Sequence, residues 1–282
     1  MGRVLALWCT ALVSLALTRD ARADEMTPEL EGLELRQKAQ AELRKLQGTL
    51  VQKDERRLAG LYLAFEPSAS DPLALAACDD DGDYVIVLSD AMLRLVSVVA
   101  RAQSYDEANG SRSIEDYAAF LGRSQIPGRR LLPPPPGFYS AQKSGTTMET
   151  RLREALAFVI GRELAHLRSG DLVCPHPTAT HESGDDEWTP AEQRKALEGA
   201  ASLYPGRQTE RDTEGMIRAL EAGRAEDGAL GLMRFFAQLE TERIVHVSRF
   251  QPTYLTHHPS PSTRASAIRA AVTQHKDAAT GK

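Results

Sequence analysis

The sequence predicts a mostly helical α+β domain that contains a small β-hairpin. Three observations favour this fold class. Apolar residues recur at helical spacing through most of the chain, two short apolar runs flank an Asp-Gly turn, and helix-capping residues precede several apolar stretches. With 282 residues, 42% hydrophobic and 26% charged, the chain has the composition of an ordinary globular protein.

The first 23 residues have the features of a signal peptide. Arg3 precedes a largely apolar core from Val4 to Leu17, which is too short to span a bilayer comfortably, and Ala21-Arg22-Ala23 resembles a cleavage site. We therefore expect an exported protein, periplasmic or secreted, with a single domain over residues 24–282. A retained signal anchor is the alternative. No later stretch is apolar enough to predict an integral membrane segment in the mature chain.

Net charge and cysteine content narrow the partners and the chemistry. The net charge of -5 provides no basic surface for nucleic acid, so no nucleic-acid partner is expected. Removal of the signal peptide leaves two cysteines, Cys78 and Cys174. In an oxidising compartment these two thiols could form a disulfide, and two free buried thiols are the alternative.

The first part of the mature chain is expected to be helical. Thr27, Pro28 and Glu29 are typical of a helix start, because they provide a capping hydroxyl, a proline and an acidic first turn. Leucines continue at roughly helical spacing to about Phe65, so we expect one long amphipathic helix that can break at Gly48.

Two short apolar runs predict the β-hairpin. They extend from Leu73 to Cys78 and from Tyr84 to Leu88, and the acidic segment between them contains Asp81-Gly82, a favoured hairpin turn. The acidic segment does not have the ligand frame of a calcium-binding loop, which favours the turn. Ser89 then caps a helix that extends to about Ala102.

Residues 105–148 are the least regular part of the predicted domain. Four consecutive prolines, Pro133 to Pro136, exclude a helix there, and we expect an irregular Pro-rich insertion. A helix from about Thr147 to Leu167 follows, and a polar loop over 171–188 carries His176 and His181. Further helices are expected from Thr189, from Thr209 to about Gly223, from Asp227 to about Val245, and from Pro261 to about Lys276.

The helix over residues 147–167 carries ionisable residues into an apolar stretch. Residues 155–160 are all apolar, which is typical of a buried helix, yet Arg162, Glu163 and His166 follow at once. Buried charges need partners. The sequence Arg-Glu-Leu-Ala-His differs in its first position from His-Glu-x-x-His, the helical motif in which two histidines bind zinc and the glutamate activates water.

Two later segments extend this likeness. Glu210-Arg-Asp-Thr-Glu214 opens a helix, and His258-Pro259 precedes Arg264. In order and spacing, the three segments resemble the family forty-eight zinc metallopeptidases, which include the HtpX-like and CAAX prenyl protease-like enzymes. The resemblance covers roughly residues 30–275 and implies a zincin-like metallopeptidase domain with a small β-hairpin or sheet.

The resemblance implies roles for individual residues. His166 and Glu210 take the places of metal ligands, and Glu163 takes the place of the general base in a zinc-dependent endopeptidase. Glu214 takes the place of an acid that orients a ligating histidine. Arg162 replaces the first zinc ligand, and a guanidinium has no lone pair to give a metal.

Three outcomes follow for such a site. In the first, no metal binds, and Arg162 supplies the missing positive charge among Glu163, Glu210 and Glu214. In the second, zinc binds through His166, Glu210 and one substitute histidine. The candidates for that substitute are His258, His257, His176 and His181. In the third, the likeness is accidental and these residues are structural.

The functional expectation is an exported protein of zinc endopeptidase lineage, with a degenerate site and weak or no proteolysis. Its partner would be a polypeptide substrate or client. The alternative is a catalytically inactive scaffold or chaperone-like module that binds polypeptide in the same cleft. Zinc is the expected cofactor only if the site tolerates Arg162.

Overall fold

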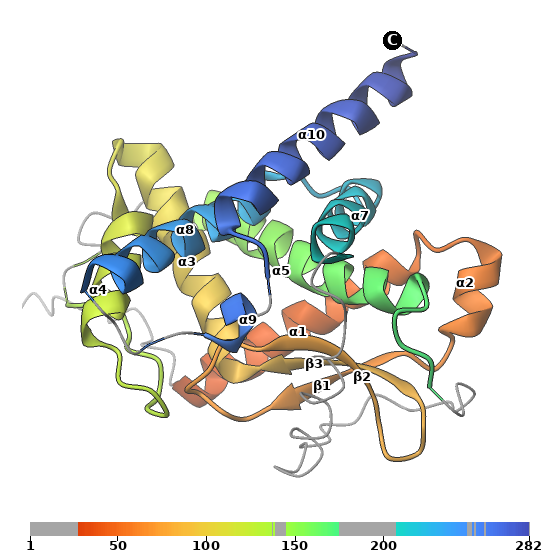
Figure 1. Ribbon diagram of the computed structural model, residues 1–282, viewed down its shortest axis with the longest axis horizontal. Coiled ribbons are helices and arrows are strands. Elements are labelled where there is room, and N and C mark those ends of the chain that lie inside the picture. The colour runs from red at the N-terminus through yellow and green to blue at the C-terminus, as the bar shows by residue number, and fades with distance from the viewer. Residues whose placement is uncertain are drawn as a thin grey trace, which may run out of the picture.

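The computed structural model describes residues 28–136, 138, 145–174, 207–246, 250, 252–256 and 258–281. Over these residues the protein is mostly helical with one small three-stranded sheet, as the sequence predicts (Figure 1). The expected signal peptide, the helix from Thr189, and His176, His181 and His257 lie outside the described residues. Within the described part of the chain, no helix combines the length and apolarity needed to cross a membrane.

The sheet contains the predicted hairpin and one additional strand. Strands β2 (Ala74–Cys78) and β3 (Tyr84–Ser89) pair antiparallel, and Gly82 takes a positive φ of 86° in the turn between them. Strand β1 (Tyr62–Glu66) pairs parallel with β3, which gives the order β1-β3-β2. The strand β2 therefore forms one edge of this sheet.

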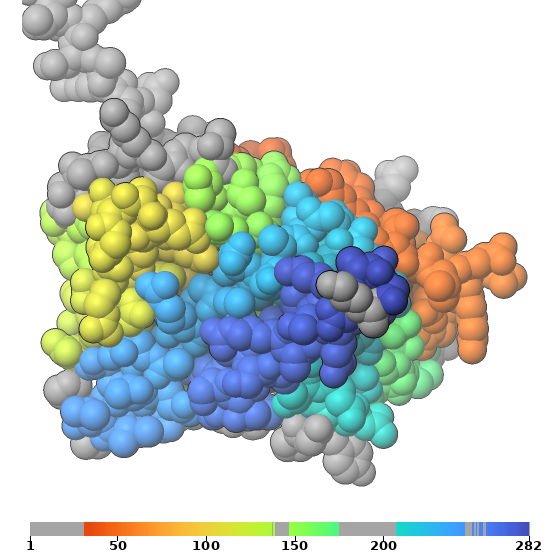
Figure 2. Space-filling view, turned by 90° about the horizontal axis from the view of Figure 1, so that it is seen from above, coloured from red at the N-terminus to blue at the C-terminus, as the bar shows by residue number. Residues whose placement is uncertain are grey.

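Helix α5 (Gly145–Arg168) runs through the centre of the molecule (Figure 1). It lies between the sheet on one side and α7 (Gln208–Glu221), α8 (Asp227–His246) and α10 (Pro261–Thr280) on the other. Helices α1 (Pro28–Gln47) and α3 (Asp90–Asn109) flank α5 and complete the core. Figure 2 shows α8 and α10 side by side on the face opposite the sheet.

The apolar stretch that predicts α5 is buried as expected. Residues 155–160 are each at most 2% exposed, and α5 as a whole packs on the sheet, α3 and α8. The capped helices expected from Ser89 and Asp227 are also present, as α3 and α8. The oxygen of Ser89 accepts a hydrogen bond from the amide of Met92, which is the capping geometry that the sequence indicates.

The long helix expected as far as Phe65 does break at Gly48, as the sequence allows, but the expectation of helix is wrong for residues 62–66. The chain turns after Gly48, forms the short α2 (Gln52–Arg57) and then enters β1. All residues of β1 are buried. Periodicity alone cannot distinguish a short, fully buried strand from a helical segment, and the parallel pairing with β3 decides the outcome.

The prediction that residues 105–148 are irregular is wrong for residues 105–109, which belong to α3, and for one further helical segment. Residues Ser113–Ser124 form helix α4, whose buried residues Ile114, Tyr117 and Leu121 belong to the core. Helix α4 packs mainly against α8. The proline run from Pro133 to Pro136 has no regular secondary structure, in agreement with the sequence.

A disulfide joins Cys78, the last residue of β2, to Cys174, a few residues after α5. The sequence left this pairing open. The disulfide links the edge strand β2 to the segment that follows α5. Both elements contribute to the candidate site described below.

Candidate functional site

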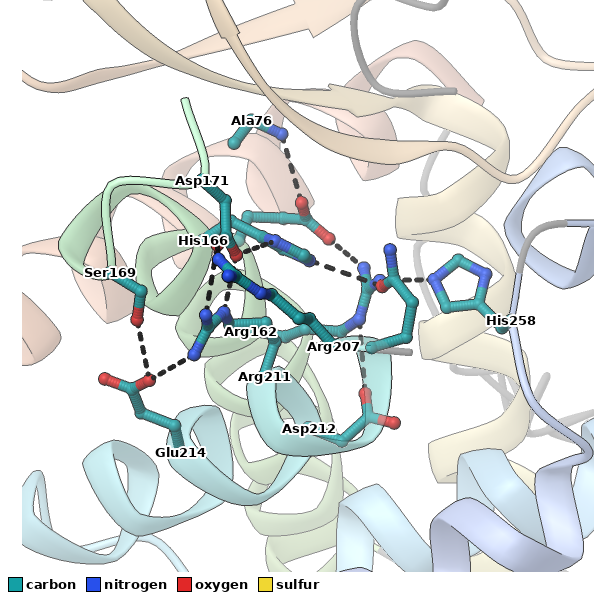
Figure 3. Close-up of polar contacts among 12 residues, drawn as sticks. Ala76, Arg162, His166, Ser169, Asp171, Arg207, Arg211, Asp212, Glu214 and His258 are labelled. Atoms are coloured by element: carbon teal, nitrogen blue, oxygen red, sulfur yellow. Dashed lines mark hydrogen bonds and ion pairs between the residues drawn. The ribbon is translucent and has the colours of Figure 1, made fainter. Parts of the chain in front are cut away.

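Arg162, Glu163 and His166 lie on α5 where the helix passes between β2 and α7. All three side chains are buried, and each residue is 2% exposed. Burying an unpaired charge in the protein interior costs several kcal/mol of folding free energy, so these side chains need partners. The surrounding contacts show how each of them is satisfied (Figure 3).

The Arg162 guanidinium occupies the middle of the site. Its Nη1 donates to Oε1 of Glu163, and its Nη2 donates to Oε1 of Gln208 and contacts Nε2 of His258. Its Nε lies 3.2 Å from Oδ1 of Asp212, an ion pair without hydrogen-bond geometry. Figure 3 shows Asp212 from α7 and His258 from the segment before α10 beside the Arg162 side chain.

The two partners from α7 are not the predicted ones. Gln208 and Asp212 are 4% and 0% exposed, whereas Glu210 is exposed to solvent. A shift of two residues turns a side chain by about 200° around a helix, so Glu210 and Glu214 cannot share the face of Gln208 and Asp212. The structure therefore places Gln208 beside His166, in the position that the resemblance assigned to Glu210.

Glu214 lies outside this group. Its carboxylate pairs with Arg168 at the end of α5, accepts a hydrogen bond from Ser169 at 3.1 Å and lies 3.2 Å from Nη1 of Arg211. The expected role of orienting a buried histidine belongs to a different carboxylate, that of Asp171.

Both carboxylate oxygens of Glu163 are held by neighbours. Oε1 accepts from Arg162, and Oε2 accepts from the backbone amide of Ala76 in β2 at 3.0 Å. The amide of Ala76 faces away from β3, because the neighbouring residues Leu75 and Ala77 lie in the ladder positions that hydrogen-bond to that strand. Glu163 thus joins the edge of the sheet to the central guanidinium.

The tautomer of His166 follows from its contact with Asp171 and from its lowered pKa. Nδ1 lies 2.9 Å from Oδ2 of Asp171, and Nε2 lies 3.3 Å from Oε1 of Gln208. Burial, with a further contribution from the Arg162 charge, lowers the pKa of His166 in spite of the opposing effects of Glu163 and Asp171, so the ring is neutral near pH 7. A neutral ring has one N–H, and the carboxylate takes it at Nδ1. The lone pair of Nε2 therefore faces Oε1 of Gln208, which is also an acceptor, so their 3.3 Å contact is not a hydrogen bond in this tautomer.

Two arginines, in addition to His166, donate hydrogen bonds to Asp171. Burial alone would raise its pKa, but hydrogen bonds from Arg211, Arg207 and His166 outweigh burial and hold the pKa well below its ordinary range. The Arg211 fork contacts both oxygens, at 2.6 and 3.0 Å. Asp171 follows α5 directly, so this clamp ties the end of α5 to the start of α7.

A second buried arginine completes the network. Arg264, from α10, is 0% exposed and makes a bidentate pair with Asp212 at 2.6 and 2.8 Å. Burial opposes the charged form, but Tyr254 and Asp212 more than compensate and raise the pKa of Arg264 further above its ordinary value. The structure thus brings Arg264 into the site through Asp212, a residue that the sequence analysis did not single out.

Tyr254, from α9 (Thr253–Thr256), contacts both arginines and His258 through its ring. The Cζ atoms of Arg162 and Arg264 lie 5.5 and 5.0 Å from the centre of its ring, and the ring of His258 stacks on it at 5.0 Å. Its hydroxyl accepts a hydrogen bond from Arg264 at 3.0 Å. This aromatic face stabilises both cations away from water.

The packing of α5 on α7 sets this geometry. Gly161 and Gly215 meet where the helices cross, and a Cβ built on Gly161 would lie only 2.8 Å from the carbonyl oxygen of Gly215. Since neither position can carry a side chain without movement, the two backbones touch. Arg162 on one helix then reaches Asp212 on the other.

Sequence reasoning identified Arg162, Glu163, His166, His258 and Arg264, which the structure brings together, but it missed other polar members of the network. These include Gln208, Asp212, Asp171, Arg211 and Tyr254. For Gln208 and Asp212, the positions of the apolar residues along α7 could have shown that they face inward. Met216 and Ala219 are the buried apolar residues of this helix, and they share a stripe with Gln208 and Asp212, not with Glu210 and Glu214.

The side chains present do not fit a zinc ion. Arg162 has no lone pair to donate, Gln208 offers a neutral amide, and of the two imidazoles that reach the site, that of His258 contacts the Arg162 guanidinium through Nε2. Among the residues that the structure describes, no three His, Cys, Asp or Glu side chains are placed to hold a metal together. The expected set of His166, Glu210 and His258 is not assembled, because Glu210 points to solvent.

Comparison with known proteins leaves the chain without an assigned relative. It matches no protein-family model, no curated protein and no solved structure.

Proposed function

We propose that this protein is an exported, non-hydrolytic descendant of zinc metallopeptidases with a zincin-like domain, and that Arg162 has replaced the metal. The observation that carries the proposal is the guanidinium at the centre of the site, paired with Glu163, Asp212 and Gln208. A planar guanidinium suits several carboxylate and amide oxygens at once, and it keeps its charge when buried.

The charges of the buried site support this proposal. Arg162 and Arg264 are balanced by Glu163 and Asp212, with His166 neutral. A site with histidine at position 162 and glutamate at position 208 would carry two units less of side-chain charge, which is the charge that one divalent cation supplies. The pair Arg162 and Gln208 therefore acts as an electrostatic substitute for a metal with its two ligands.

The positions of Glu163 and His166 also support the loss of hydrolysis. A general base must reach a water or substrate proton, but the Glu163 oxygens are held by Arg162 and by the amide of Ala76. His166 retains the tautomer of a ligand, with Asp171 behind it. The site thus keeps its supporting groups while a cation from the chain itself fills its centre.

Polypeptide binding is the function that this geometry retains. The outer edge of β2 faces away from β3 toward α5; on this edge the amide of Ala76 already donates to Glu163, and the amide of Ala74 is the one offered to a partner chain. An edge strand beside a former catalytic helix offers backbone hydrogen bonds to an extended chain. We therefore infer a scaffold or chaperone-like role in which a client polypeptide is bound but not cut.

The proposal is tested by rebuilding the metal site. The double variant Arg162→His with Gln208→Glu should bind about one zinc per chain, measured by elemental analysis after dialysis, because it restores three protein ligands with His166. Adding His166→Ala to that variant should abolish the gain. The wild type should retain no stoichiometric zinc and should not cleave an unfolded polypeptide such as reduced, alkylated lactalbumin.

The opposite result would be decisive as well. Stoichiometric zinc in the wild type that disappears with His166→Ala would refute the replacement of the metal by Arg162. Retention of the reduced lactalbumin without cleavage, weakened by Ala74→Pro at the outer edge of β2, is expected for the binding role. If the wild type does not retain this polypeptide at all, the non-hydrolytic lineage stands and the client-binding role falls.

A further inference from the structure

Three exposed apolar side chains lie at the end of the molecule where α4 and α8 finish. Ile126, Ile244 and Val245 are 62%, 70% and 65% exposed, and they are half of the six large apolar residues that are exposed in the described part of the chain. A single exposed apolar residue is ordinary on a protein surface, but a group of them beside polar residues marks an interaction site. None of the three belongs to α5 or α7, so this end is separate from the Arg162 site.

Helices α4 and α8 run in the same direction and carry these residues to the same end. Near the start of α4, Oε1 of Glu115 lies 2.8 Å from Nε of Arg234 in α8. Near the end of α4, Nε of Arg123 lies 3.1 Å from Oε2 of Glu242 in α8, and a Cβ built on Gly122 would lie 2.8 Å from Cβ of Glu242. The three exposed apolar residues follow this contact by two to four residues in the direction that both helices share (Figure 1).

Ile126 is the first residue of a hydrogen-bonded turn. The amide of Arg129 donates to the carbonyl oxygen of Ile126 at 3.1 Å, Pro127 is the second residue, and Gly128 takes a positive φ of 72°, which is the pattern of a type II turn. Gln125, 6% exposed, donates from its side-chain nitrogen to the carbonyl oxygens of Ile126 at 3.1 Å and Arg129 at 2.8 Å. The backbone of the turn is therefore fixed, and the exposure of Ile126 belongs to the folded state.

The charged side chains at this end are more basic than acidic. Arg129 and Arg130 are exposed, and within the described part of the chain their guanidinium groups make no hydrogen bond or ion pair. Residues 121–130 and 239–245 together contain four arginines and two glutamates, which gives a local charge of +2 in a chain whose net charge is -5. This end is therefore complementary to a negatively charged surface.

We propose that this end of the protein binds the surface of an anionic lipid membrane. Ile126, Ile244 and Val245 enter the headgroup region, and the two free arginines of the turn contact lipid phosphates. Peripheral binding of this kind combines buried apolar area with attraction to anionic lipids. Because the turn is already fixed, no loop has to be ordered when Ile126 enters the membrane.

The shape of this end favours a membrane over a protein partner. Residues 126–130 are all exposed, so the turn projects from the surface, and Ile244 and Val245 lie near the C-terminal end of α8. Projecting aliphatic side chains can enter a fluid layer directly, whereas a protein partner would have to supply a matching hollow for them.

Co-sedimentation with lipid vesicles tests the proposal. The protein should bind vesicles made of equal parts phosphatidylglycerol and phosphatidylcholine, and it should bind vesicles of phosphatidylcholine alone about tenfold or more weakly. Raising the salt concentration should weaken binding to the mixed vesicles, because salt screens charges at the membrane surface.

Two double variants separate the apolar and the charged contributions. Ile126→Ser with Ile244→Ser should weaken binding to the mixed vesicles by about tenfold or more, because apolar area that enters the membrane is lost. Arg129→Gln with Arg130→Gln should weaken it by about tenfold or more and should reduce its dependence on salt. All four positions are exposed, so both variants should unfold at close to the same urea concentration as the wild type.

Matched controls come from the opposite end of the molecule (Figure 1). Val51 is 57% exposed and directly precedes α2, and Arg56 is an exposed arginine within that helix. Val51→Ser and Arg56→Gln should each leave the affinity for the mixed vesicles within about twofold of the wild type.

Several outcomes would refute the proposal. These are the absence of binding to either kind of vesicle, equal binding to both, and unchanged binding in either double variant. A second copy of the chain is the alternative occupant, and light scattering without lipid distinguishes it. The wild type and the isoleucine double variant should then have the same molar mass, and a dimeric wild type beside a monomeric variant would replace the membrane by an interface between copies.

Discussion

Gly161 of α5 and Gly215 of α7 bring two helix backbones into direct contact. A Cβ added to Gly215 would lie 2.5 Å from the amide nitrogen of Arg162, and one added to Gly161 would lie 2.8 Å from the carbonyl oxygen of Gly215. Helices usually pack with their axes 8–10 Å apart, a spacing set by side chains at the contact, and glycines at both sides permit the closest approach. The site depends on this approach, because Asp212 and Gln208 reach Arg162 only across it.

Gly215→Ala is therefore expected to destabilise the protein by about 1–3 kcal/mol, because the new methyl group meets backbone atoms that cannot rotate away. Urea unfolding followed by circular dichroism measures the change. Gly32→Ala is the matched control, since Gly32 lies within α1 and an added Cβ there meets nothing within 4 Å. That control should stabilise the protein by about 0.5–1 kcal/mol, so an equal response of the two variants would contradict the close crossing.

Arg162→Met is expected to destabilise the protein by about 3–5 kcal/mol. The variant leaves the buried carboxylate of Glu163 without its cationic partner and removes one of the two cations that face Asp212. Adding Glu163→Gln should recover part of the loss, because it removes one of the stranded charges. Thermal and urea unfolding of the single and double variants measure the coupling.

Arg207→Met provides the reference for a surface pair. The Arg207 side chain is 56% exposed and lies 2.9 Å from the Asp171 carboxylate, so its loss should cost no more than about 1 kcal/mol. If Arg162→Met were as mild as Arg207→Met, the central guanidinium would not be compensating buried carboxylates.

The sequence allowed the helices with local signals to be predicted. Ser89 caps α3, and the apolar stretch from Ala155 to Ile160 marks α5 as buried. The strand β1 was missed because its partner β3 begins about twenty residues later, and a short apolar run contains no information about pairing at that distance. Helix α4 was missed for a related reason, since Arg112 at its start contributes no capping side chain.

For the candidate site too, the sequence predicted what is local to one helix and not what depends on how two helices pack. Arg162, Glu163 and His166 are neighbours on one helix, so their spacing alone indicates a cluster. On α7 the sequence offers two acidic or polar pairs with the same separation, Gln208 with Asp212 and Glu210 with Glu214. Only the packing of α7 on α5 decides which pair faces inward, and the close contact at Gly215 fixes that choice.

Acidification should weaken the capping of α4 by Asp106. Burial alone would raise the pKa of Asp106, but hydrogen bonds from the Ser111 hydroxyl and from the amides of Ser113 and Ile114 outweigh it and lower the pKa below 3.8. Because the unfolded chain then binds the proton more readily, this stabilisation is present above about pH 4 and is lost as the pH falls through the native pKa.

Asp106→Asn tests this dependence. Urea unfolding at neutral pH should show a loss of about 1–2 kcal/mol, because the carboxylate holds the amides of Ser113 and Ile114 at 2.6 and 3.3 Å. The difference from the wild type should shrink as the pH falls through the lowered native pKa of Asp106. Asp116→Asn, on the exposed side of the same helix, is the control and should show neither the loss nor its pH dependence.

The disulfide between Cys78 and Cys174 should contribute substantially to stability. Its two cysteines are 96 residues apart in sequence, and closing so long a loop restricts the unfolded chain strongly. Cys78→Ala with Cys174→Ala should therefore destabilise the protein by about 2–4 kcal/mol in guanidinium unfolding without reductant. Reduction of the wild type should reproduce most of this loss, and it should leave the double variant unchanged.

Alkylation followed by mass measurement checks the bond itself. The segment from residue 24 to 282 contains only Cys78 and Cys174, so the oxidised chain should take up no alkylating reagent, and the reduced, unfolded chain should take up two equivalents. Two reactive thiols in the unreduced, unfolded protein would contradict the bond.

Because Cys174 follows Asp171 closely, loss of the bond also frees the segment that orients His166. We therefore expect the rebuilt zinc site to bind metal more weakly in the cysteine double variant than in the oxidised chain.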